Sequence, residues 1–79
     1  MRTLYVGGLP PEADEEHLRT VFEPFGPVGA ARVIMRSSTG TCRGFGYVTF
    51  DDEAHALRAM QELDGEVVRG SKWRVHVAK

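Results

Sequence analysis

The chain has 79 residues, of which 42% are hydrophobic and 27% charged, and its formal net charge is −1. This length allows one hydrophobic core and one domain, 1–79, and the composition is that of a globular protein rather than a disordered one. No apolar run approaches the roughly 20 residues of a membrane span, and the N-terminus lacks a signal-peptide pattern. The single cysteine, Cys42, cannot form an internal disulfide. We therefore expect an intracellular, monomeric domain without membrane contact.

The first part of the chain predicts a strand, a helix and a strand. A β-rich run at 3–6 ends at a glycine and proline cluster, 7–11. Asp14 then stands before two glutamates, which is typical of a helix N-cap and first turn. Four apolar residues follow at helical spacing, namely Leu18, Val21, Phe22 and Phe25. Gly26 ends this helix, and side chains alternate over 28–36 as in a strand.

The remaining part predicts a strand, a second helix and a last strand. A polar turn, 37–41, precedes a strand at 42–50, and the acids that follow suit the start of a helix. The apolar stripe of that helix consists of Ala56, Ala59, Met60 and Leu63. Gly65 suits its C-terminal cap, a small hairpin is expected near 66–70, and 72–78 forms the last strand.

The predicted order is therefore β-α-β-β-α-β. Each helix has one apolar stripe, so both helices can pack on the same face of a four-stranded antiparallel sheet. We predict an α+β fold, a ferredoxin-like βαββαβ sandwich with two helices on one sheet face. The opposite face has no predicted cover, and a binding function can be located there.

The segment 43–50, Arg-Gly-Phe-Gly-Tyr-Val-Thr-Phe, carries the strongest functional signal. Side chains alternate across a strand, and Val48 and Phe50 suit the core under the helices. Phe45 and Tyr47 must then lie on the solvent side, and the neighbouring glycines leave space for a close helix. Rings exposed on a rigid sheet can stack on nucleobases, at about 1–3 kcal/mol per base. The alternative interpretation is that the rings are cross-strand pairs, or are covered by a terminal segment.

The same octamer resembles the signature of the RNA recognition motif family, and 4–9, Leu-Tyr-Val-Gly-Gly-Leu, is similar to the family's hexamer. The resemblance extends over nearly the whole chain, although glycine stands at position 8 where asparagine is common. It implies that Tyr5 and Tyr47 stack on two successive bases, that Phe45 lies against sugar rings, and that Arg43 binds a phosphate. The implied function is binding of single-stranded RNA, with single-stranded DNA as a further candidate ligand.

The charges support an anionic ligand on the sheet. The eleven acids lie in the predicted helices and their flanks, and none lies between 24 and 50. Seven of the ten basic residues lie in the predicted strands, namely Arg2, Arg32, Arg36, Arg43, Lys72, Arg74 and Lys79. We therefore expect a basic sheet face. Additional candidate RNA-binding residues are Arg32, Arg74, His76 and Lys79. By alternation, Trp73 belongs to the core.

Other functions fit the sequence less well. A protein-interaction module on the same scaffold is the alternative, but such modules commonly lose the sheet aromatics or gain an aromatic motif near 69–73. An enzyme of acylphosphatase type needs an anion-cradling loop with a nucleophile or base, which 7–11 does not offer. His17 and His55 lie on different predicted helices, so we expect no catalytic site, no metal and no cofactor.

Two kinds of closer relative remain open. The hexamer, the stretch 22–26 and the ending 74–79 are similar to the RNA-binding heads of nuclear cyclophilins. The excess of arginine over lysine and the lack of asparagine suit the short bacterial members of the family. The expected location is the nucleus or cytoplasm in the first case and the cytoplasm in the second.

Overall fold

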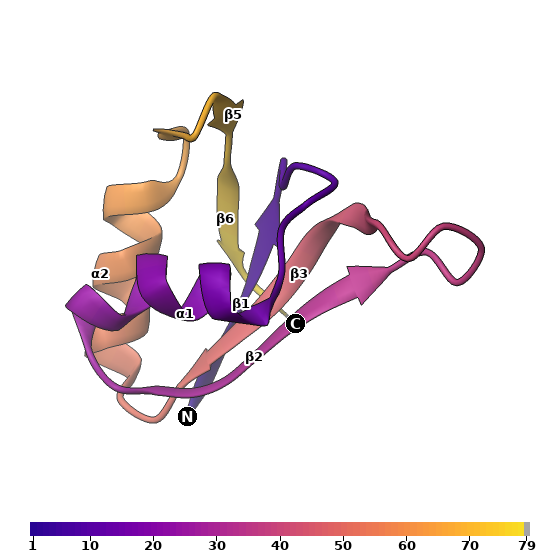
Figure 1. Cartoon of the computed structure of the whole chain (residues 1–79). Coiled ribbons are helices and arrows are strands. Elements are labelled where there is room, and N and C mark those ends of the chain that lie inside the picture. The colour runs from indigo at the N-terminus through magenta and orange to yellow at the C-terminus, as the bar shows by residue number, and fades with distance from the viewer. Residues whose placement is uncertain (79) are drawn as a thin grey trace.

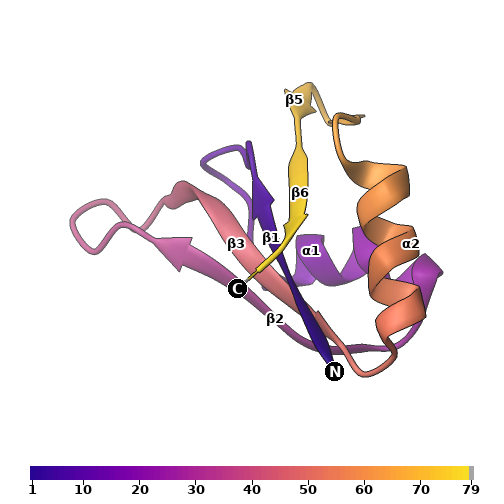
Figure 2. The ribbon, with the colours of Figure 1, turned by 180° about the vertical axis from the view of Figure 1, so that it is seen from behind.

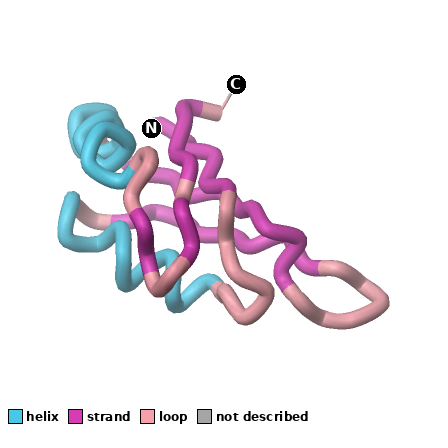
Figure 3. Tube along the Cα trace, turned by 90° about the horizontal axis from the view of Figure 1, so that it is seen from above, coloured by secondary structure: helices cyan, strands magenta, loops and turns pink. Residues whose placement is uncertain are grey.

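A computed structural model describes residues 1–78 and confirms the predicted α+β fold. The elements are β1 (Arg2–Gly7), α1 (Glu15–Phe22), the 3₁₀ helix η1 (Glu23–Phe25), β2 (Val28–Met35), β3 (Cys42–Phe50), α2 (Glu53–Leu63), β4 (Val67–Val68), β5 (Ser71–Lys72) and β6 (Arg74–Val77). Both α-helices cover the same face of the main sheet (Figures 1 and 3). No helix in 1–78 has the length and apolar character to cross a membrane.

The main sheet has four antiparallel strands in the order β2-β3-β1-β6, and β4 and β5 form a separate hairpin. The register places Tyr5 opposite Tyr47 on one side and opposite His76 on the other. Arg32 of β2 is in turn opposite Tyr47. One row of side chains therefore crosses all four strands.

Carboxylates begin both helices. Asp14 accepts a hydrogen bond from the His17 N–H at 2.8 Å, and Asp52 accepts one from the Ala54 N–H at 2.8 Å. These bonds satisfy N–H groups that have no partner within the first helical turn. The first helix is shorter than its apolar stripe predicts, because Pro24 lacks an N–H and the chain continues as the 3₁₀ turn η1.

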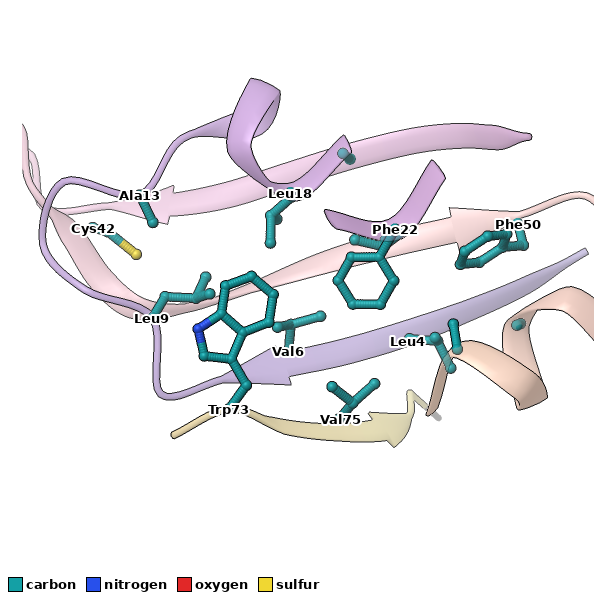
Figure 4. Close-up of a cluster of buried hydrophobic side chains, with 14 residues drawn as sticks. Leu4, Val6, Leu9, Ala13, Leu18, Phe22, Cys42, Phe50, Trp73 and Val75 are labelled. Atoms are coloured by element: carbon teal, nitrogen blue, oxygen red, sulfur yellow. The ribbon is translucent and has the colours of Figure 1, made fainter. Parts of the chain in front are cut away.

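The core lies between the helices and the sheet. Its largest fully buried side chains are Trp73, Phe22, Phe50, Leu4, Leu18, Val6, Val48 and Val75. The rings of Phe22 and Trp73 stack with centroids 6.2 Å apart at 21°, and Phe50 meets Phe22 edge-on (Figure 4). Burial of each such side chain contributes about 1.5–3 kcal/mol. The prediction that Trp73 belongs to the core is confirmed.

The predicted last strand, 72–78, is wrong at its start. Lys72 pairs with Val67 in the β4–β5 hairpin and is not part of the main sheet. The Trp73 N–H donates to the Glu66 carbonyl at 2.8 Å, and the Trp73 carbonyl accepts from the Gly65 N–H at 2.8 Å. These bonds tie the segment to the exit of α2, so the sheet strand begins only at Arg74.

The glycines of the octamer allow a close approach of strands rather than of a helix, contrary to expectation. A Cβ added at Gly46 would lie 2.4 Å from the Arg32 carbonyl oxygen of β2. Gly44 has φ +98° and its carbonyl accepts from the Leu9 N–H at 2.9 Å. Gly46 therefore lets β3 lie close to β2. Gly44 is explained by its left-handed backbone instead, because an added Cβ there would lie 3.9 Å from the Leu9 carbonyl oxygen, an ordinary contact distance.

Candidate nucleic-acid interface

Three aromatic rings meet on the two central strands of the sheet, β1 and β3. They lie on the sheet face that carries no helix, which Figure 2 shows as a ribbon. Tyr5 of β1 is near-parallel to Phe45 of β3, with ring centroids 5.9 Å apart at 26°. Tyr47 stands edge-on to both, at 6.0 Å from Tyr5 and 6.4 Å from Phe45. We call these three residues the aromatic platform. Each ring is half-buried, so the neighbouring rings cover part of its surface and solvent reaches the rest.

Strand alternation produces the aromatic platform. Leu4 and Val6, on either side of Tyr5, are fully buried on the helix side, as is Val48 beside Tyr47. Because consecutive side chains in a strand point to opposite faces, the rings must lie on the open face. The predicted placement is confirmed. The rings also form the cross-strand contacts of the alternative interpretation, so their mutual packing fixes the orientation of the platform.

Exposed side chains flank the platform along the row that crosses the sheet. Arg32 lies on β2 next to Tyr47, and His76 lies on β6 next to Tyr5. Arg43 is exposed on β3 and shares the face of Phe45, two residues further along the strand. Three of the predicted site residues thus surround the rings.

The predicted basic sheet face is only partly present. Arg2 of β1 forms an ion pair with Glu53 of α2 on the helix side. Arg74 of β6 pairs with Asp64, with Nε and Oδ1 3.3 Å apart. Lys72 lies on the hairpin, and Lys79, a predicted RNA-binding residue, lies outside the described residues. The positive charge is therefore concentrated at the β2–β3 side of the platform.

Asp64 follows α2, and its side chain contacts the outer edge of β6. Its Oδ1 also accepts a hydrogen bond from the Val75 N–H at 3.0 Å. This bond is the main cause that lowers the pKa of Asp64, opposed by desolvation and reinforced by the charges of Arg74 and His76. The same carboxylate therefore holds the Arg74 side chain and occupies a backbone N–H at the edge of the sheet.

A pair of hydroxyl groups beside the platform was not among the predicted site residues. Thr3 and Thr49 lie opposite each other with their Oγ1 atoms 2.9 Å apart. Thr3, Tyr47 and Ala78 line a shallow hollow, and the Ala78 N–H donates to the Thr3 carbonyl at 2.9 Å. Alternation from Tyr5 and Tyr47 already places both threonines on the open face, so the signal was present in the sequence.

Within residues 1–78, no group of three or more His, Cys, Asp or Glu side chains is placed to hold a metal ion. His17 packs its ring edge-on against Trp73 at 5.6 Å and is part of the core margin. Cys42 is buried, and its sulfur accepts from the Gly44 N–H at 3.2 Å. Neither residue faces the platform.

A βαββαβ sandwich with open aromatic rings and flanking arginines defines a nucleic-acid-binding module. Among known protein families, the sequence model of the RNA recognition motif family matches residues 4–74 of the chain. The chain therefore belongs to the RNA recognition motif family. The predicted family, fold and RNA-binding class are confirmed, and this family membership agrees with a binding module rather than an enzyme.

Individual relatives are similar over almost the whole chain. Glycine-rich RNA-binding protein 2, mitochondrial, of Arabidopsis thaliana is 44% identical over 75 residues, which are 95% of this chain and 48% of that protein. The chain thus spans about half the length of that relative. The crystal structure of RNA Binding Protein PG1 has a TM-score of 0.93 and 40% identity, covering 99% of this chain and 94% of the other. The Sxl-lethal protein in complex with RNA has a TM-score of 0.92 and 29% identity, covering 99% and 47%.

Proposed function

We propose that the chain binds single-stranded RNA by stacking bases on the aromatic platform. The observation that carries this proposal is the contact of all three rings, with centroids 5.9–6.4 Å apart, on the sheet face without helices. Every base has a π-face, so such a surface accepts bases of different identity. The solved complex of the similar Sxl-lethal protein with RNA supports this ligand class.

The platform residues differ in their proposed roles. Tyr5 and Tyr47 each present a ring to one base, and Phe45 lies against the sugar between them. Arg43 binds a phosphate, because a guanidinium offers two parallel donors to phosphate oxygens. Arg32 and His76 contact the strand at the two ends of the row. Arg74 binds RNA once its ion pair with Asp64 opens. Lys79 is proposed as an RNA-binding residue from the sequence alone.

A single strand is the proposed form of the ligand. Bases in a duplex are stacked on one another, and only unpaired bases can spread over protein rings. Single-stranded DNA offers the same bases and phosphates but no 2′-hydroxyl, so we expect weaker binding. We propose an intracellular monomer.

Fluorescence anisotropy with a labelled pool of random single-stranded RNA tests the proposal. The native chain should bind the pool, and the double variant Tyr5→Ala, Tyr47→Ala should lose about 2–6 kcal/mol of binding free energy. Val67→Ala is the matched control, because Val67 is 65% exposed on the β4–β5 hairpin, away from the platform. Equal affinity of the native chain and the double variant would contradict the proposal.

A further inference from the structure

The strand β2 forms one outer edge of the main sheet, next to β3 alone (Figures 1 and 2). Beside it lies a hollow lined by two apolar and three acidic residues, namely Val33, Met35, Asp14, Glu15 and Glu16. We call the outer edge of β2 and this hollow the edge site. We propose that the edge site binds a short extended segment of another protein, which carries an apolar and a basic side chain two residues apart.

The outer side of β2 has backbone groups that no strand of 1–78 pairs with, because β3 is its one neighbour in the sheet. Side chains occupy the sheet edges at two other places. Asp64 accepts from the Val75 N–H of β6, and Arg19 Nη1 donates to the Val28 carbonyl at 3.3 Å, where β2 begins. Beyond Val28, the side-chain hydrogen bonds of 1–78 do not reach the backbone of β2. An edge that is left uncovered can pair with an added strand.

The regular part of this edge is short. The register between β2 and β3 shifts between Val28 and Ala30 and again between Val33 and Met35, so 30–33 is the stretch that pairs without irregularity. Such shifts bend a strand and increase its twist. The edge site therefore fits a segment with a few paired residues rather than a long strand.

Met35 provides exposed apolar surface at the edge site. It is 46% exposed, and Val33 beside it is half-buried at the margin of the core. Side chains on one face of two neighbouring strands lie about 5 Å apart, so an apolar side chain of an added strand can contact both residues. This contact removes apolar surface from water and favours binding.

Glu15 and Glu16 place negative charge beside this apolar surface. Both are exposed, and neither forms an ion pair within 1–78. Asp14 adds a third carboxylate, although its Oδ1 accepts from the His17 N–H. Acids are favourable at any helix N-terminus, so their charge alone does not indicate a ligand. Their position next to exposed apolar side chains on a free sheet edge indicates a partner with a basic group beside an apolar one.

A second copy of the chain fits the edge site less well. Two β2 strands paired about a twofold axis would bring the Arg32 side chains of both copies to the same sheet face, and like charges destabilise a strand pair. Arg32 lies on the open face of the sheet, whereas Ala31 is buried on the helix side. The hollow on the helix side is thus separate from the aromatic platform, and the inference does not depend on RNA binding.

Two synthetic peptides of the same composition test the inference. In Thr-Lys-Thr-Val-Thr-Lys-Thr-Val-Thr, the lysines and valines share one face when the peptide is extended. In Thr-Lys-Val-Thr-Thr-Lys-Val-Thr-Thr, the lysines and valines lie on opposite faces. Fluorescence anisotropy of the labelled peptides should show that the native chain binds the first about tenfold more tightly than the second. Equal affinities, or no binding of either peptide, would overturn the inference.

Variants of the edge site should weaken binding of the first peptide. The double variant Glu15→Gln, Glu16→Gln should weaken it about fivefold at low salt and little at high salt, because two exposed charges are lost. Met35→Ser should weaken it about fivefold at every salt concentration, because an apolar contact is lost. Glu62→Gln, on the exposed side of α2, is the charge control and should bind as the native chain does. Unchanged affinity in both edge-site variants would also overturn the inference.

Amide hydrogen exchange distinguishes strand addition from other modes of binding. The first peptide should slow exchange of the outward N–H groups of 30–33 and shift the amide signals of 14–16, while the ring signals of Tyr5 and Tyr47 stay in place. Shifts confined to the aromatic platform would overturn the inference. Shifts at 30–33 that depend on protein concentration without peptide would identify a second copy as the occupant and overturn it as well. Each of these results leaves the proposed binding of RNA unaffected.

Discussion

Asp64 and Arg74 form an ion pair at the outer edge of the sheet, with Asp64 Oδ1 3.3 Å from Arg74 Nε. The same oxygen accepts the Val75 N–H at 3.0 Å, a backbone donor at the unpaired edge of β6. Unpaired edge donors invite association with other strands, and a carboxylate placed against one blocks it. The pair also draws a proposed RNA-binding arginine toward the α2 side.

Asp64→Asn should release Arg74. The asparagine side-chain oxygen can still accept from the Val75 N–H, but it carries no charge to hold the guanidinium. We expect RNA affinity to rise about two- to fivefold and the salt slope to become steeper by up to about 0.7. Anisotropy over a range of potassium chloride concentrations measures both. Glu62→Gln, which removes a charge from the exposed part of α2, is the control. Unchanged affinity and slope would show that Arg74 makes no contact with RNA.

Stability should depend on the ionisation of Asp64. The hydrogen bond from the Val75 N–H, with the charges of Arg74 and His76, holds the pKa of Asp64 below its ordinary value of 3.8 in the folded chain. A carboxyl with a lowered folded pKa stabilises the fold above its unfolded pKa and loses this contribution as pH falls through the folded pKa. The native chain should therefore exceed Asp64→Asn in urea midpoint near pH 6, and the difference should shrink below about pH 4. A difference that grows on acidification would contradict the assignment.

Gly8 is required by a close backbone contact. It has φ +78°, and an added Cβ would lie 2.1 Å from the Lys72 carbonyl oxygen. Gly40 has a similar φ, +70°, but an added Cβ meets nothing within 4 Å. We expect Gly40→Ala to cost about 1–2 kcal/mol from the left-handed backbone alone, and Gly8→Ala to cost at least about 3 kcal/mol. Urea unfolding measures both. Equal losses of unfolding free energy in Gly8→Ala and Gly40→Ala would show that the loop around Gly8 moves away from Lys72.

The same contact distinguishes this chain from the family's common hexamer. Asparagine tolerates a left-handed backbone, but its Cβ would meet the Lys72 carbonyl as alanine does. Gly8→Asn should therefore destabilise the chain nearly as much as Gly8→Ala.

Arg69 is strained in the β4–β5 hairpin. It has φ +50° and is followed by Gly70 at φ +82°, and it is the one residue of 1–78 other than glycine with a positive φ. Two successive positive φ angles favour Asn-Gly in a two-residue hairpin turn. Arg69→Asn should raise the free energy of unfolding by about 0.5–1 kcal/mol. Thermal unfolding measures the change in stability. Arg69→Ala keeps the backbone strain and should give no gain in stability. A gain for both variants would show that loss of the arginine charge is the cause.

Local sequence patterns predicted the parts of the molecule that depend on periodicity. The strand at 42–50 has the bounds expected from its alternation, and Phe45 and Tyr47 lie on the predicted face. Alternation is strongly constrained there because a shift by one residue would expose Val48 and Phe50 and bury the polar face.

Contacts between residues distant in the sequence were not predictable in the same way. The pairing of Arg74 with Asp64 depends on where α2 ends relative to β6, and the shift of Lys72 into the hairpin depends on backbone bonds of Trp73. Charge counting assigned both basic residues to the sheet face, because composition does not contain the direction of a long side chain.

Mapping of RNA on the assigned chain by nuclear magnetic resonance tests the central claim most directly. On titration with a single-stranded octanucleotide, the ring signals of Tyr5, Phe45 and Tyr47 should shift most, and the amides of α1 and α2 should stay in place. Shifts concentrated on the helices, with the three rings unaffected, would contradict stacking on the aromatic platform.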